Sequence, residues 1–305
     1  MAITHADALG RPFVTASKDE LGETLVSGLF EREYLQSRMA AGKNLVFASA
    51  FALAWEEVAR VGGSTILMQY DPPVMVGMQA EKDYKNDLES AAWFAGGNYG
   101  NAGVLGQIRE GLGVHFNGVA TPTLLPDNVE PEHLFAYAYM FKHVAYNERE
   151  GQSAQIAAGP RPEDFILDLP LTSADDRLVV ASIPPAETLA DTVERALRPQ
   201  TPFTPAGMPA AWALERYRVP KINFDITWKF RNTSARYCLK VDEFGTTVLS
   251  EAAQMTLPLP PIIVARPGGR APTPILVVLT KRNRTRPYFA AWVESTELLI
   301  PDPVG

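Results

Sequence analysis

The residue types that most often carry catalysis are scarce in this chain and are not grouped. Its four histidines have neither the spacing of a metal site nor that of a catalytic pair; they are His5, His115, His133 and His143. There is no GxSxG nucleophile motif, and Gly111, Gly113 and Gly118 lack the strand–loop–helix context of a phosphate loop. We therefore expect no catalytic residue, no metal site and no cofactor, and an enzyme is the least favoured class.

The charged residues restrict the partners. A net charge of −7 opposes binding to nucleic acid or to an anionic membrane, because such binding depends on neutralising phosphates. One basic run stands between two apolar stretches: Lys281, Arg282, Arg284 and Arg286. The run fits an exposed hairpin turn or, alternatively, a site for an anion or an acidic partner. We expect the partner to be another protein.

Two features favour the cytoplasm. No apolar run reaches the roughly 20 residues that span a bilayer, and the N-terminus lacks the basic start and apolar stretch of a signal peptide. The single cysteine, Cys238, cannot form a disulfide within the chain, which agrees with a reducing compartment. Its simplest role is that of a small buried hydrophobe.

The apolar pattern predicts helices first and strands later. The chain has 305 residues, 46% of them apolar, which is enough to bury the core of one large domain. Apolar residues recur at helical spacing from Leu21 to Tyr34, and residues 44–61 begin as an apolar run and continue as a buried helix. Strands are predicted at 165–169, 177–183, 215–230, 237–241, 275–279 and 288–293, with one helix at 187–197. Residues 72–113 are rich in glycine and predict no clear element.

One later segment alternates in the way that a strand requires, because successive side chains of a strand point to opposite faces. One face would carry small or β-branched residues: Thr246, Val248, Ser250 and Ala252. The other would carry Thr247, Leu249, Glu251 and Ala253, and there we expect Glu251 to reach solvent. An ordinary edge strand or loop would show the same alternation. After Ala253 the chain becomes rich in proline, which predicts an extended segment that resists pairing.

Several stretches resemble motifs of the serpin family and occur in the family's order. Residues 44–51, 124–142, 177–222, 240–247 and 275–293 are similar to the motifs NVFFSPxS, LLPPGSxDPxTRLVLxNAxYFKG, LSMxILLPxE with VxLPKFxI, VNEEGTEA and PFLFxIxxxxTxxxLFMGxV. The resemblance implies an α+β serpin-like fold with three β-sheets, N-terminal helices and an exposed reactive loop, some peripheral helices being absent. It implies a single domain over residues 1–305, with a helical segment at 1–42 and the hinge and reactive loop at 244–274.

The resemblance also implies a mechanism and a set of site residues. In the family, a protease cuts the exposed loop, which then inserts as a new central strand and carries the acylated enzyme with it. The matching hinge residues are Glu243, Gly245, Thr246, Thr247, Val248, Ser250 and Ala252. The family's spacing places the cut bond at Leu259–Pro260, and Met255–Thr256 is a second candidate. Lys221 and Glu243 match the ion pair that bridges the top of the family's sheet.

Departures from the family's pattern leave two functions open. Proline after Leu259 is a poor substrate for most serine proteases. The polar positions beneath the family's sheet carry other residues here: Ala48, Phe51, Tyr137 and Ala235. These departures favour a non-inhibitory serpin-fold protein that binds or serves as a scaffold within an assembly. Gly245 and the alternation after it favour a protease inhibitor that acts through loop insertion. This is the function that we expect first, with a serine or cysteine protease as the target and the non-inhibitory protein as the alternative.

Overall fold

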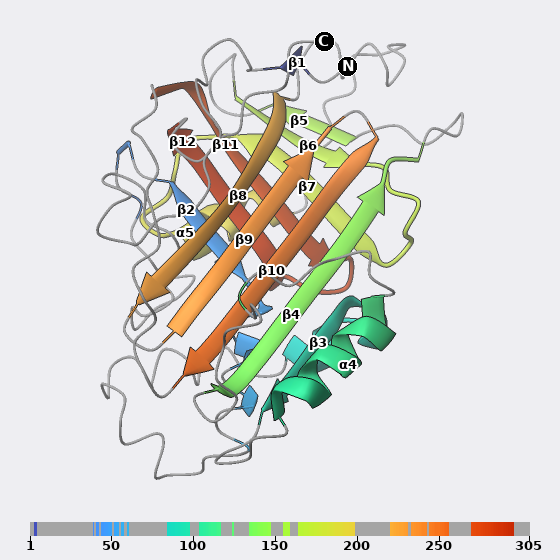
Figure 1. Ribbon diagram of the computed structural model, residues 1–305. Coiled ribbons are helices and arrows are strands. Elements are labelled where there is room, and N and C mark those ends of the chain that lie inside the picture. Colours follow the sequence, from blue (N-terminus) through green and yellow to red (C-terminus); the bar gives the residue numbers. More distant parts are fainter. Residues whose placement is uncertain are drawn as a thin grey trace.

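Two β-sheets stacked as layers make up most of the described part of the structure, a computed structural model (Figure 1). It describes residues 3–4, 39, 41–42, 44–50, 52–54, 56–57, 60, 84–97, 104–116, 124, 134–147, 155–158, 164–198, 220–230, 233–242, 244–255 and 270–295. In Figure 1 the sheet nearer the viewer is the front sheet, and the sheet behind it is the rear sheet.

The front sheet has the strand order β1-β8-β9-β10-β4-β3. Its strands are β1 (Ile3–Thr4), β8 (Pro220–Phe230), β9 (Thr233–Val241), β10 (Gly245–Met255), β4 (Leu134–Ala145) and β3 (Trp93–Gly97). β1 runs parallel to β8, and every other neighbouring pair is antiparallel. β8, β9 and β10 follow one another along the chain, whereas β10 also pairs with the distant β4.

The rear sheet has the strand order β2-β12-β11-β7-β6-β5, with all pairs antiparallel. Its strands are β2 (Leu45–Ala48), β12 (Pro287–Ser295), β11 (Arg270–Lys281), β7 (Asp176–Ser182), β6 (Phe165–Leu169) and β5 (Gln155–Ala158). The central strands are continuous apolar runs, and residues 276–279 and 178–181 are fully buried. Strands that are buried on both faces have such continuous apolar sequences, without polar residues at alternate positions.

The main core lies between the two sheets. It combines rear-sheet residues such as Val277 and Phe289 with the inward residues of the front sheet, such as Met140 and Phe224. Helix α5 (Leu189–Leu197) adds its apolar stripe of Leu189, Val193 and Leu197 to this core. Thr188 caps the helix, because its side chain accepts a hydrogen bond from the backbone N–H of Asp191 at 3.1 Å.

A second, smaller core lies on the outer face of the front sheet under helix α4 (Val104–Phe116). Ile108, Leu112 and Phe116 recur every four residues and form the buried stripe of the helix. They pack against Tyr137 and Tyr139 of β4. Figure 1 shows α4 beside β4, close to β3.

The predicted elements agree with the structure through most of the second half. Strands at 165–169, 177–183, 237–241, 275–279 and 288–293, and the helix at 187–197, are confirmed with shifted ends. The strand predicted from 215 is described from Pro220, which cannot donate within a ladder and begins β8. The apolar run predicted at the start of residues 44–61 forms the strand β2, and helical residues follow it at 50, 52–54, 56–57 and 60, as predicted.

Other parts of the prediction are revised or lie outside the described residues. The described residues form two sheets, not the three that the resemblance implies. The helix predicted from Leu21 to Tyr34, and nearly all of the segment 1–42, lie outside the described residues. Gly111 and Gly113 lie within α4, so they form no phosphate loop. Among the described helices, none is long and apolar enough to cross a membrane.

Candidate functional site

The strand β10 contains the predicted hinge and lies at the centre of the front sheet. It pairs with β4 from Gly245↔Ala145 to Met255↔Leu134, and with β9 from Thr246↔Val241 to Gln254↔Thr233. The expectation that the loop is exposed from residue 244 onward is therefore wrong for residues 245–255. Backbone hydrogen bonds on both sides place this segment in the sheet of an uncut chain.

The alternation predicted for this segment is confirmed, and it explains why the segment can occupy a central position. Thr246, Val248, Ser250 and Ala252 point to the inner face and have no exposed surface. All four are small or β-branched, so they fit between the sheets without displacing larger residues. The hydroxyl of Ser250 is buried and has no hydrogen-bond partner among the described residues.

Gly245 begins the strand where the backbone of β4 comes very close. A Cβ added at Gly245 would lie 2.2 Å from the carbonyl oxygen of Val144 and 2.9 Å from Cα of Ala145. Both atoms belong to the backbone, so neither can move away by rotation of a side chain. Glycine is therefore needed here because two strands approach each other.

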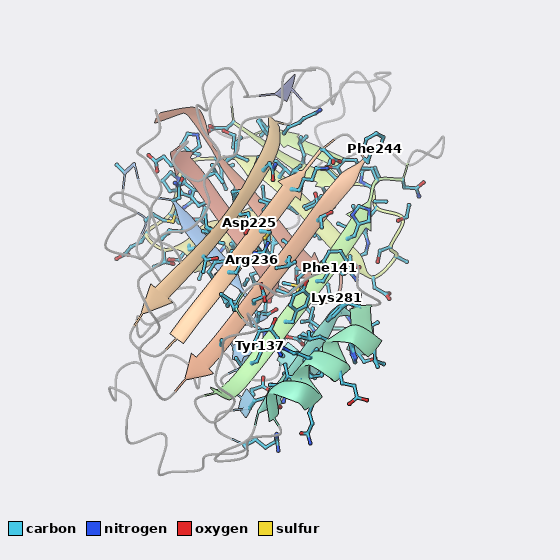
Figure 2. All side chains as sticks on the ribbon, in the orientation of Figure 1. Tyr137, Phe141, Asp225, Arg236, Phe244 and Lys281 are labelled. Carbon is cyan, nitrogen blue, oxygen red and sulfur yellow. The ribbon has the colours of Figure 1, made fainter. Side chains whose placement is uncertain are left out.

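A tight turn joins β9 to β10. Asp242 Oδ1 accepts hydrogen bonds from the backbone N–H groups of Phe244 at 2.8 Å and Gly245 at 3.1 Å. Partial burial would raise the pKa of Asp242, but hydrogen bonds from Lys240 and from these N–H groups outweigh it and lower the pKa. Phe244 projects from the turn with 68% of its surface exposed (Figure 2).

The outer face of β10 carries a buried acid. Glu251 was expected to reach solvent, and this expectation is wrong, because the residue has no exposed surface. Its Oε1 accepts hydrogen bonds from the Tyr137 hydroxyl at 2.7 Å and from the Leu124 N–H at 3.3 Å. Its Oε2 lies 3.1 Å from Nη1 of Arg236. Glu251 is thus bound by groups from strands on both sides of β10.

Arg236 extends this network to a third strand. Its Nε and Nη2 donate to the two carboxylate oxygens of Asp225 on β8 at 2.8 and 2.7 Å, a bidentate pair. We call Tyr137, Asp225, Arg236 and Glu251 the clasp; Figure 2 labels three of these residues on the front sheet. Burial would raise the pKa of Asp225, but hydrogen bonds from Arg236 and Cys238 outweigh it and lower that pKa. The clasp connects β8, β9, β10 and β4.

Cys238 lies near the clasp on β9. Burial raises the pKa of its thiol, and the nearby carboxylate of Asp225 raises it further. The thiol is therefore a poor nucleophile at neutral pH. It is only partly buried, so the role of small hydrophobe expected from sequence describes it in part.

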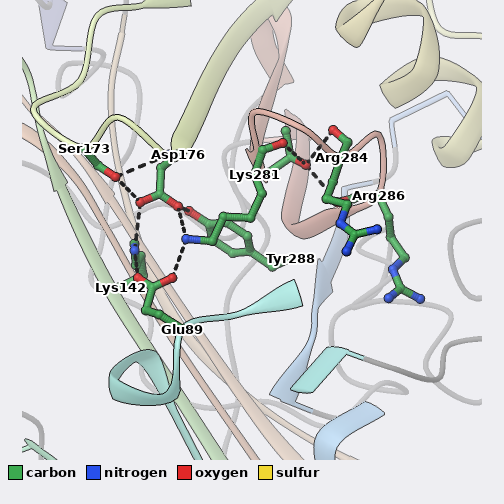
Figure 3. A network of polar contacts seen from close by, with 9 residues as sticks. Glu89, Lys142, Ser173, Asp176, Lys281, Arg284, Arg286 and Tyr288 are labelled. Atoms are coloured by element: carbon green, nitrogen blue, oxygen red, sulfur yellow. Dashed lines mark hydrogen bonds and ion pairs between the residues drawn. The ribbon is translucent and has the colours of Figure 1, made fainter. Parts of the chain in front are cut away.

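A ring of four charges connects the two sheets beside β10, at the level where Lys142 pairs with Val248. Asp176 of β7 accepts from Lys142 of β4 at 2.8 Å and from Lys281 of β11 at 2.9 Å, and both lysines also contact Glu89 (Figure 3). We call Glu89, Lys142, Asp176 and Lys281 the charge ring. The side chain of Asp176 has no exposed surface, and Ser173 Oγ donates to it at 2.6 Å.

The pKa values in the charge ring follow from burial and close partners. Burial would raise the pKa of Asp176, but hydrogen bonds from Lys142, Ser173 and Lys281 outweigh it and lower the pKa. Burial lowers the pKa of Lys142, and its bond to Asp176 offsets this only in part. The ring lines a cavity of about 560 Å³.

The basic run between β11 and β12 forms the predicted hairpin turn. Three of its four cations contact carboxylates of the protein itself. Lys281 belongs to the charge ring, and Arg284 and Arg286 both contact Asp87 at the end of α3 (Tyr84–Asp87). Glu89, which follows Asp87, precedes the short 3-10 helix η2 (Ser90–Ala92). An anion site at the hairpin would therefore have to compete with Asp87 and Glu89.

The remaining predicted site residues are only partly described. Glu243, Thr256, Leu259 and Pro260 lie outside the described residues, so both candidate cut bonds and the pair of Glu243 with Lys221 stay predictions. Met255 is the last residue of β10. Of the four positions beneath the family's sheet, Ala48 and Ala235 are buried in the main core. Tyr137 instead belongs to the outer core, and Phe51 lies outside the described residues.

Comparisons with known proteins give a likeness in fold and none in sequence. No protein-family model matches the chain, and no curated protein sequence matches it. A loop C-sheet serpin polymer matches at 10% identity, with 88% of this chain and 92% of that chain covered and a TM-score of 0.45. A thermophilic serpin, tengpin, in the latent state matches at 10% identity, covering 85% and 93%, with a TM-score of 0.42. Cleaved serpin 42Da matches at 11% identity, covering 83% and 92%, with a TM-score of 0.39. The chain is thus similar to serpins over most of its length, at low sequence identity.

Proposed function

We propose that this protein is a non-enzymatic, serpin-like binding or scaffold protein whose loop strand rests inside the front sheet. The observation that carries the proposal is the position of β10, which pairs with β4 and β9 along its length without any cut in the chain. The partner would be another protein.

The position of β10 bears directly on inhibition. A serpin-type inhibitor derives its trapping force from a strand that joins the sheet only after cleavage. Here the corresponding residues already bury their inner face and already complete both hydrogen-bond ladders. Cutting the chain after Met255 would add no strand to the sheet, so little free energy would be left to displace a bound protease.

The second candidate is a protease inhibitor that acts through loop insertion, and two observations favour it. Gly245 and the small inner residues of β10 are compatible with insertion. In that case β10 would have to leave the sheet in the active protein, and the described arrangement would be the final state. The two candidates therefore differ in where β10 lies before cleavage.

Cleavage of the intact protein distinguishes them. The chain is nicked between Met255 and Arg270 with a non-target protease, and the melting temperatures of nicked and intact protein are compared. We expect a change of no more than about 2 °C, because no strand is gained. A rise of tens of degrees, or a denaturation-resistant complex with a serine or cysteine protease, would overturn the proposal in favour of the inhibitor.

A further inference from the structure

We propose that Arg236 and Tyr137 form a carboxylate-binding site that fixes the register of β10 by recognising Glu251. The inference rests on the proposed function, because it requires that β10 lies in the front sheet. It adds a role for three side chains that the family resemblance does not assign.

Glu251 is suited to mark a register because it is the only ionisable residue from Gly245 to Met255. It stands directly opposite Arg236 on β9 and opposite Tyr139 on β4. Arg236 is already oriented by its two bonds to Asp225, at 2.8 and 2.7 Å. The Nη1 atom of the guanidinium therefore has a fixed position along the strands, opposite residue 251 of β10.

Beyond the turn and Gly245, the inner face of β10 specifies its register weakly. A slip by two residues keeps each side chain on its own face, and the inner residues Thr246, Val248, Ser250 and Ala252 are similar enough to exchange places. Packing of these inner residues would therefore tolerate such a slip, and only the turn at 242–245 and the close contact at Gly245 would oppose it. A buried polar contact can supply the missing discrimination, because a wrong register leaves polar groups without partners.

A slip breaks the clasp in either direction. If β10 moves by two residues toward its start, Glu251 faces Cys238 and Phe141 and approaches Asp225, a like charge. If it moves the other way, Leu249 faces Arg236. In both registers the contact between Glu251 and Arg236 seen at 3.1 Å is lost inside the protein, where an unpaired charge is costly.

Tyr137 and Tyr139 provide a comparison within one strand. Both are fully buried and both belong to the outer core beneath α4. The hydroxyl of Tyr137 donates to Glu251 at 2.7 Å, whereas the hydroxyl of Tyr139 has no hydrogen-bond partner among the described residues. Removing each hydroxyl by substitution with phenylalanine therefore separates the clasp from packing.

The native cysteine allows the register to be read by disulfide formation in the full chain. Cys238 stands opposite Leu249, so Leu249→Cys places two thiols at facing positions. Cα atoms of facing antiparallel residues are ~4.5–5.5 Å apart, within the range of a disulfide. Thr247→Cys stands opposite Lys240 and meets Cys238 only after a slip by two residues. The ratio of the two cross-linking rates under mild oxidation reports the register.

We expect Leu249→Cys to cross-link and Thr247→Cys to remain largely reduced. Adding Glu251→Gln should lower the ratio of the two rates by at least about tenfold, because the charged contact with Arg236 is lost. Tyr137→Phe should lower the ratio as well, and Tyr139→Phe should leave it unchanged. If Glu251→Gln does not fold, the two tyrosine variants decide the question.

Two outcomes would count against different parts of the reasoning. An unchanged ratio in Glu251→Gln, or equal effects of Tyr137→Phe and Tyr139→Phe, would refute the register role and leave the proposed function standing. Failure of Leu249→Cys to cross-link in the otherwise native chain, with an oxidant strong enough to react with the poorly nucleophilic Cys238 thiol, would mean that β10 is outside the sheet. That result would remove the basis of the proposed function and of this inference together.

Discussion

Substitution of Gly245 by alanine tests whether β10 is packed against β4 as closely as the structure indicates. The new Cβ would lie 2.2 Å from the Val144 carbonyl oxygen, where ordinary contact begins at 3.4 Å. The strands would have to separate by about 1.2 Å (3.4 − 2.2), since backbone atoms cannot rotate away. The pairs that would open first are Gly245↔Ala145 and Thr246↔Val144.

The size of the effect follows from these contacts. Losing about two backbone hydrogen bonds at ~1 kcal/mol each, together with overpacking, gives a destabilisation of about 2–4 kcal/mol. With an unfolding entropy of ~2.1 cal/mol/K per residue, this loss of stability lowers the melting temperature of a 305-residue chain by about 3–6 °C. Backbone amide exchange at Thr246 and Thr247 should also become faster.

Gly113 supplies the matched control for this prediction. It lies on an exposed part of α4, and an added Cβ there meets nothing within 4 Å. Gly113→Ala should therefore raise the melting temperature by about 1 °C, through helix propensity alone. If Gly245→Ala melts within 1 °C of the unsubstituted protein and exchanges at the same rate, the close approach of β10 and β4 is wrong.

Three further predictions concern the charged groups and α4. Asp176→Asn should lower the melting temperature by about 5–8 °C, because it leaves two lysines without their buried partner. Glu89→Gln should lower it by less, because the Glu89 carboxylate is partly exposed. Equal effects of the two substitutions in thermal melts would contradict this. Because folding lowers the pKa of Asp176 and Asp225, the folded state binds fewer protons than the unfolded state around pH 4. The free energy of unfolding should therefore stay constant above about pH 5 and fall as the pH drops through 4. The fall should be less steep in Asp176→Asn than in the unsubstituted protein. Equal slopes in the two proteins would refute the lowered pKa of Asp176. Gly111→Ala should destabilise α4 and reduce the helical circular dichroism signal, since the new Cβ would lie 2.3 Å from the Phe94 ring. The double variant with Phe94→Leu should recover part of that signal. An unchanged signal in Gly111→Ala would count against this packing.

Four strands of the rear sheet, β6, β7, β11 and β12, could be predicted from sequence because they carry their signal locally. Runs such as 275–279 and 288–293 are apolar and β-branched or aromatic, and burial on both faces leaves no polar interruption. The helix at 187–197 was also predictable, since its apolar residues recur every four positions between flanking prolines.

The helix α4 was missed because its composition argues against a helix. Gly106, Gly111 and Gly113 lower its intrinsic propensity, so its stability must come from packing on the sheet. The signal that could have identified it is the spacing of Ile108, Leu112 and Phe116, four residues apart. Glycine at 111 is itself explained by contact with Phe94, which no local pattern reveals.

The burial of Glu251 was missed because its partners are distant in sequence. Tyr137 lies 114 residues earlier, and the alternation of β10 gives no information about what covers its outer face. Part of the clasp was nonetheless accessible. A tight turn at residues 242–245 places Arg236 opposite Glu251 by simple counting, and an acid facing a base across a hairpin is a recognisable pair.

The order of the strands has a consequence for how the protein folds. β8, β9 and β10 are consecutive in the chain and pair in that order, so contacts among them close only short loops. Docking of β10 onto β4 closes a loop of about a hundred residues, as between Gly245 and Ala145, and should come later. A chain that folds in this sequence brings β10 to the sheet as part of a preformed meander. The nascent protein would then reach the inserted arrangement directly, without passing through a long-lived state in which this strand is outside.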